Sequence, residues 1–150
     1  MKIYITIALL FINGLGVIYA QRNRLKVVVE NIEQLEGNIK LVLSKDSAQF
    51  LSDQPRMEFV REQKADAYQM IFVYTNLQDG EYALAVYQDI NENNKLDTKK
   101  FGIPAEPFAF SNQALRKFGP PYFSQASFEV KGGGEHTHHL KMIYRKPKKK

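Results

Sequence analysis

The sequence predicts an all-β fold, a single antiparallel β-sandwich of about seven strands. Short runs rich in β-branched and aromatic residues recur along the chain, separated by turn signals such as Asp79-Gly80 and residues 132–134. No segment carries apolar residues at helical spacing. A length of 150 residues and an apolar fraction of 44% suit one packed domain.

Seven runs are predicted to be strands because β-branched and aromatic residues dominate or alternate in them. The first two are expected to form a hairpin through Glu33–Asn38, and the fourth and fifth a hairpin through Asp79-Gly80. The third is expected at a sheet edge, because Pro55 before it limits pairing. The predicted strands are residues 25–32, 39–43, 57–60, 67–74, 80–88, 126–131 and 136–144.

Residues 101–121 are predicted to form a compact, packed connection. Four prolines and two glycines interrupt this segment, which excludes a regular strand or a long helix. One helical turn is expected within Ser111–Phe118. Five phenylalanines argue that the connection packs against the fold: Phe101, Phe108, Phe110, Phe118 and Phe123.

The ends of the chain predict an exported protein, secreted or periplasmic. Residues 1–20 have the pattern of a signal peptide, with Lys2, an apolar run over residues 3–12 and Ala20 at the cleavage edge. The alternative is an uncleaved membrane anchor, for which this run is short. The expected organisation is therefore a signal peptide (1–20), one β-sandwich domain (21–144) and a basic tail (145–150), with no transmembrane span after cleavage.

Charge and cysteine content exclude several classes of function. Removing residues 1–20 takes one lysine from the 21 basic residues and none from the 16 acidic ones, which leaves a formal charge of +4. Five basic residues lie in 145–150, so the domain itself is near neutral and no nucleic-acid partner is predicted. The tail is expected to be solvated or to touch anionic envelope polymers. The absence of cysteine excludes disulfides and Cys-ligated zinc.

A polar loop follows the fifth predicted strand and has the spacing of a calcium-binding loop. Oxygen-bearing residues stand at every second position, and calcium takes six to eight oxygen ligands. Lys100 stands where a bidentate acid is expected, so any affinity should be weak, on the order of 10⁻⁴ to 10⁻³ M. The alternative is an Asx-rich turn that caps its own backbone without an ion. The candidate ligands are Asp89, Asn91, Asn93, the Lys95 carbonyl, Asp97 and, from beyond the loop, Glu106.

Other chemistry has weaker support in the sequence. His136 and His138 share a face of the last predicted strand, next to His139, but no third zinc ligand is evident. No nucleophile elbow, zinc-protease motif or phosphate-binding loop is present. The remaining enzymatic alternative is a hydrolase in which Glu106 pairs with Asp89 or Asp97.

Several motifs of this chain together resemble a known family. They are residues 89–97, 101–112 and 118–123, preceded by Asn76-Leu77 and Gly80-x-Tyr82-Ala83. This combination resembles the exported bacterial proteins grouped as DUF2141, although Glu92 and Asn94 stand where the family commonly has glycine. The resemblance implies a small β-sandwich of immunoglobulin-like or transthyretin-like type. It implies no activity, and it groups Glu106, Phe110, Ser111 and Asn112 with the loop as one unit.

These observations together predict an exported, non-enzymatic binding or accessory module whose loop is stabilised by weakly bound Ca²⁺. A cell-envelope glycan or protein is the expected partner, held by exposed rings such as Tyr122, Phe108 or Phe110. In the alternative, a purely structural envelope protein, the same rings belong to the core. The burial of these three rings distinguishes the two hypotheses.

Overall fold

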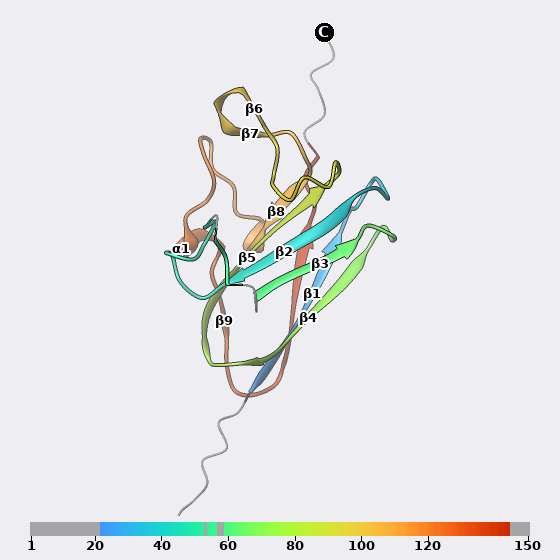
Figure 1. Cartoon of the computed structure of the whole chain (residues 1–150). Coiled ribbons are helices and arrows are strands. Elements are labelled where there is room, and N and C mark those ends of the chain that lie inside the picture. The colour runs from blue at the N-terminus through green and yellow to red at the C-terminus, as the bar shows by residue number, and fades with distance from the viewer. Residues whose placement is uncertain (1–21, 53, 57–58, 145–150) are drawn as a thin grey trace, which may run out of the picture.

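A computed structural model of the chain describes residues 22–144, except for residue 53 and residues 57–58. The fold is mostly β, with ten strands in several open sheets and one short helix (Figure 1). About seven strands were expected. The number is larger because short strands of two or three residues form in regions that were predicted to be loops. The strands are β1 (Asn23–Glu30), β2 (Asn38–Ser44), β3 (Val60–Lys64), β4 (Met70–Leu77), β5 (Gly80–Asp89), β6 (Thr98–Lys99), β7 (Ile103–Pro104), β8 (Phe108–Phe110), β9 (Phe128–Val130) and β10 (Glu135–Lys141).

The first sheet has the order β10-β1-β4. β1 and β4 pair antiparallel, but β1 and β10 run parallel, from Arg24 opposite Glu135 to Glu30 opposite Lys141. The prediction of a purely antiparallel fold is therefore wrong for this pair. Neighbouring parallel strands must be joined by a long connection. Here the connection contains all the strands from β2 to β9.

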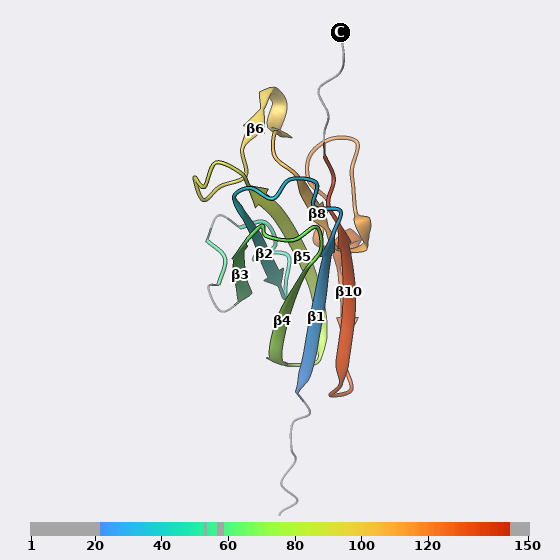
Figure 2. The same ribbon diagram turned by 90° about the vertical axis from the view of Figure 1, so that its right-hand side faces the viewer.

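The second sheet has the order β3-β2-β5-β8, and β9 pairs with the beginning of β5. All of its pairs are antiparallel. A separate ribbon of β6 and β7 projects beyond the two larger sheets (Figure 2). Two 3₁₀ turns, η2 (Lys100–Gly102) and η3 (Ser111–Gln113), and the helix α1 (Phe123–Ala126) lie in the connections. The helical turn expected within Ser111–Phe118 is thus the short turn η3.

Both predicted hairpins are wrong, although their strands exist. β1 and β2 lie in different sheets, and so do β4 and β5. The reason is that each connection leads from one sheet to the other instead of turning within one sheet. Leu77 before the Asp79-Gly80 turn and Tyr82 after it are both buried in the same core. The Nδ2 of Asn23 donates to Asp79 Oδ1 at 2.8 Å and so fixes this turn.

The main core lies between the two larger sheets, and a smaller core lies on the other face of β5. Side chains of β1, β4 and β10 meet those of β2 and β5 in the main core. Because the Ala83 side chain is small, it leaves space on the second face of β5. The aromatic connection packs into this space, as expected. The smaller core contains Ala83, Phe108, Phe110, Ala114 and Ala126, with Phe50 and Phe123 against it.

The predictions for the two ends of the chain lie outside the described residues. They are the signal peptide at residues 1–20 and the basic tail at residues 145–150. Within the described part of the chain, no helix has the length and apolar character needed to cross a bilayer.

Candidate functional site

The polar loop begins at Asp89, the last residue of β5, which is buried. Its carboxylate folds back over the loop: Oδ1 accepts the backbone N–H of Asn93 at 3.0 Å and Oδ2 that of Asn94 at 2.6 Å. Gly37 packs directly on this turn, since a Cβ built there would lie 2.0 Å from the Asp89 carbonyl oxygen. Asp89 therefore anchors the loop to the end of the second sheet.

The two asparagines bind both the loop backbone and Asp97. The Oδ1 of Asn91 accepts the N–H of Asn93 at 3.2 Å, and the Oδ1 of Asn93 accepts the N–H of Lys95 at 3.1 Å. Their Nδ2 atoms donate to the Asp97 carboxylate at 2.7 and 3.1 Å. The alternating residues thus act as consecutive Asx turns.

Glu106 closes the loop from beyond its end. Its Oε1 accepts the N–H of Ile90 and its Oε2 that of Asp97, each at 2.9 Å. The structure therefore brings all six predicted residues together, including Glu106. Glu106 is buried, as is Asp89. Burial, followed by the charges of Asp89, Glu62 and Glu106, raises the pKa of Tyr87 to about 12.

Hydrogen bonds within the loop occupy the side chains of Asp89, Asn91, Asn93 and Asp97. An ionised carboxylate offers roughly four acceptor positions, and Asp89 uses two of them for backbone N–H groups. The amide nitrogens of Asn91 and Asn93, rather than their oxygens, face Asp97. Among the described residues, no group of three or more His, Cys, Asp or Glu side chains is placed to hold a metal ion. Calcium would have to replace both amide contacts to Asp97, and its binding stays a prediction.

Two residues that complete the loop could not be recognised from the sequence. The sequence indicates Gly37 only as part of a turn and Lys40 only as part of a strand. Lys40 Nζ donates to Asn94 Oδ1 at 3.1 Å and also pairs with Glu62 at 3.3 Å. Gly37 directly precedes β2, and Lys40 lies within it. Only the pairing of β2 with β5 brings these residues close to Asp89.

The three histidines of β10 have separate partners. His136 Nε2 lies 3.2 Å from Asn23 Oδ1, and His139 Nδ1 lies 2.7 Å from Glu30 Oε1. His138 stacks on Phe128, with ring centroids 4.2 Å apart. Burial of its ring lowers the pKa of His138, and the nearby His139 lowers it further.

The aromatic connection exposes only one of the three rings expected to bind a ligand. Phe108 and Phe110 are buried, so their predicted role in stacking on a ligand is wrong: they are needed to fill the smaller core. Tyr122 is 59% exposed. The Arg116 guanidinium lies 3.9 Å from its ring centroid and also donates to the Pro120 carbonyl at 3.2 Å. The ring borders an open groove, lined by Ser47, Phe50, Leu51, Pro121, Phe123 and Ser124 among others.

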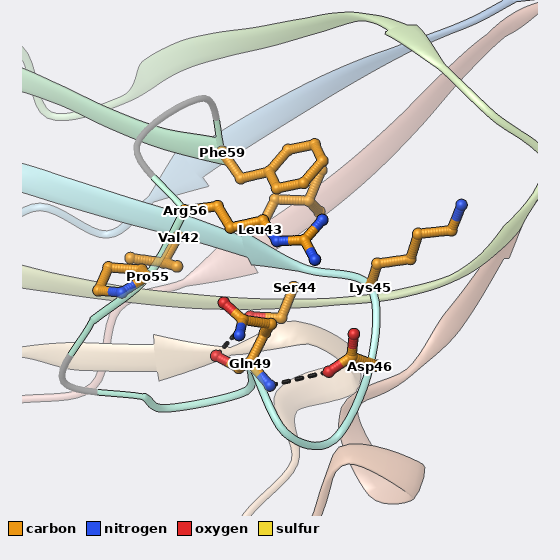
Figure 3. Close-up of a pocket in the computed structure, with 9 residues that line it drawn as sticks. All are labelled: Val42, Leu43, Ser44, Lys45, Asp46, Gln49, Pro55, Arg56 and Phe59. Atoms are coloured by element: carbon orange, nitrogen blue, oxygen red, sulfur yellow. Dashed lines mark hydrogen bonds between the residues drawn. The ribbon is translucent and has the colours of Figure 1, made fainter.

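A second recess lies between the end of β2 and the following loop (Figure 3). It has room for a single water molecule at most. Within it, Gln49 N–H donates to Asp46 Oδ1 at 2.9 Å, and the Ser44 hydroxyl donates to the Gln49 carbonyl at 3.3 Å. These bonds indicate that the recess is a structural turn.

The fold and the loop define a small, mostly β domain with a self-bonded polar loop and a packed aromatic connection. The chain belongs to the family described as "Uncharacterized protein conserved in bacteria (DUF2141)", whose model matches residues 27–138. The match includes both the polar loop and the aromatic connection. No curated protein and no solved structure matches the chain.

Proposed function

We propose that the protein is an exported, non-enzymatic binding module, and that its ligand is a glycan of the cell envelope held in the groove beside Tyr122. We also propose the finer fold of a sandwich, of immunoglobulin-like or transthyretin-like type, which the core shared by the two larger sheets supports. The observation that carries the function is the Tyr122 ring, exposed at the border of the groove and held by Arg116. An exposed ring beside polar donors suits a sugar, which has both apolar faces and hydroxyl groups.

The use of the acidic residues supports a non-enzymatic role. Both oxygens of Asp89 and both of Glu106 accept backbone N–H groups, so these carboxylates join segments of the chain. Asp97 accepts the amides of Asn91 and Asn93. A glycosidase needs two carboxyl groups directed at one open site.

The proposal of export rests on the signal-peptide pattern of residues 1–20. We propose that the mature protein is periplasmic or secreted. Weakly bound Ca²⁺ is part of the proposal, with Asp97, Asn91, Asn93 and the Lys95 carbonyl as its ligands near the surface. One observation favours the alternative, a structural envelope protein without an ion site: the Asp and Asn side chains of the loop already bond to one another and to its backbone.

The test is binding of residues 21–150 to purified bacterial peptidoglycan, measured by co-sedimentation. The Tyr122→Ala variant should bind about tenfold more weakly, since removing a central aromatic anchor typically costs over about 1 kcal/mol. Tyr68→Ala is the matched control, because Tyr68 is similarly exposed but lies between β3 and β4. Equal affinities of the two variants, or no binding of the unaltered protein, would contradict the proposal.

A further inference from the structure

The projecting β6–β7 ribbon presents a bare aromatic ring at its turn. Phe101 is 98% exposed, more than any other large hydrophobic residue that the structure describes. It lies between paired Lys99 and Ile103, and Ile103 is itself 38% exposed. A ring in this position contributes nothing to either core, so folding alone does not account for it.

The backbone at this position also disfavours phenylalanine. Phe101 has φ 66° and ψ 25°, in the left-handed region, and Gly102 follows with φ 67°. Glycine and asparagine adopt this conformation readily, whereas a bulky residue is strained in it. Stability would therefore favour asparagine at position 101, and a strained, exposed ring indicates a role outside the fold.

Two lysines, Lys99 and Lys100, directly precede this ring, and Lys95 lies in the loop before the ribbon. All three are exposed, and no ion pair of Lys99 or Lys100 is found in the described part of the chain. The connection of residues 114–122 rises at the same end of the molecule as the ribbon (Figures 1 and 2). It carries a second exposed pair, Phe118, 78% exposed, with Lys117 Nζ 5.6 Å from its ring centroid.

The described chain also ends on this side. Tyr144 donates its hydroxyl to Gln88 Oε1 at 3.1 Å, and Gln88 directly precedes Asp89, where the polar loop begins. Among the described residues, Lys99, Lys100 and Lys117 therefore bring positive charge to the same end of the molecule as the exposed rings of Phe101 and Phe118.

We propose that this end docks on an anionic lipid bilayer, with Phe101 inserted at the headgroup level and Lys99 and Lys100 against the lipid phosphates. Aromatic rings favour the membrane–water interface, and each lysine close to an anionic surface strengthens binding. A protein partner is disfavoured by shape, because a turn of a two-stranded ribbon offers far less area than a stable protein interface needs. The inference does not depend on the glycan groove.

The absence of tryptophan from the chain makes insertion directly measurable. Phe101→Trp places a single tryptophan in residues 21–150, which contain every described strand. Its emission should shift to shorter wavelength with vesicles of equal parts phosphatidylglycerol and phosphatidylcholine, and stay unchanged with phosphatidylcholine alone. Tyr68→Trp is the control and should show no shift with either vesicle. An unshifted Phe101→Trp emission would overturn the proposal.

Partitioning of the variants separates insertion from simple charge attraction. Phe101→Asn should weaken vesicle binding about tenfold or more while the melting temperature stays equal or rises, because asparagine relieves the strained backbone. Lys99→Gln and Lys100→Gln should each weaken binding about fivefold at low salt. If the lysine variants lose binding and Phe101→Asn does not, the attraction to the vesicle is purely electrostatic and the proposed insertion of Phe101 is wrong. Lipid-free peptidoglycan tests the groove separately, so the two proposals fail independently.

Discussion

Gly37 is the residue on which the position of the polar loop depends most directly. Its φ of +65° is unfavourable for other residues, and an added Cβ would meet the Asp89 carbonyl oxygen at 2.0 Å and the Ile90 Cα at 2.6 Å. All of these contacts are with backbone, which cannot move aside as a flexible side chain does. The start of β2 and the beginning of the polar loop must therefore separate if any side chain is added at position 37.

We expect Gly37→Ala to lower the free energy of unfolding by roughly 3 kcal/mol or more, measured by urea denaturation. Gly132→Ala is the matched control: its φ is +85°, but a Cβ added there would meet no atom within 4 Å. That variant should lose only about 1 kcal/mol, the cost of the left-handed conformation itself. Equal losses would show that contact with Asp89 is unimportant.

The polar loop could be predicted because its hydrogen bonds join residues that are close in the sequence. Contacts between residues that are distant in the sequence could not be predicted. The alternating Asp and Asn side chains bond to backbone groups within a few positions, as in the Asx-rich turn that was the alternative to a calcium-binding loop. The contact between Gly37 and Asp89 joins residues that are far apart in the sequence. The sequence left open whether Phe108 and Phe110 are buried or bind a ligand, since their burial depends on the space above Ala83.

At the scale of elements, alternation of apolar residues located most strands but did not assign them to sheets. β5 was predicted well because one of its faces carries Tyr82, Leu84 and Val86 and the other carries alanines. The Asp79-Gly80 turn has the sequence of a hairpin, yet it joins two sheets. A turn sequence of this kind predicts only that the chain changes direction. Whether the chain stays in one sheet depends on which residues before and after the turn are buried.

The polar loop as a whole gives the calcium prediction. We expect millimolar Ca²⁺ to raise the melting temperature of residues 21–150 relative to EDTA, because a ligand at ten times its dissociation constant adds over ~1 kcal/mol. Asp97→Ala should abolish this increase. Asp89→Ala is less suitable, since its buried carboxylate holds two backbone N–H groups and its loss would destabilise the loop without any ion.

Glu129→Gln is the control for this experiment, because Glu129 lies on the surface and pairs only with Lys131 at 2.7 Å among the described ion pairs. It should respond to Ca²⁺ as the unaltered protein does. An unchanged melting temperature in all three proteins would favour the self-capped turn. A response retained in Asp97→Ala would place the ion elsewhere.

At the scale of the whole molecule, β10 connects parts of the fold that are distant in sequence. It extends the first sheet next to β1, while His138 on it stacks on Phe128 of β9, which pairs with β5 of the second sheet. The backbone N–H of Asn112 in η3 donates to His138 Nε2 at 3.4 Å. A protonated Nε2 could not accept this bond. The charge state of His138 therefore affects the contact between the two sheets.

This arrangement predicts that stability decreases in mild acid. Burial lowers the pKa of His138 from its ordinary value of 6.5, so near that pH the unfolded chain binds more protons than the folded one. Its contribution should be complete above about pH 6.5 and decrease as the pH falls through that value toward the lower folded-state pKa. Urea denaturation between about pH 8 and about pH 5 should show this loss, and His138→Gln should reduce it. His139→Gln removes the smaller of the two causes that lower the pKa of His138, so most of the pH dependence should remain. If the pH dependence disappears in this variant, the charge of His139 matters more than the burial of His138.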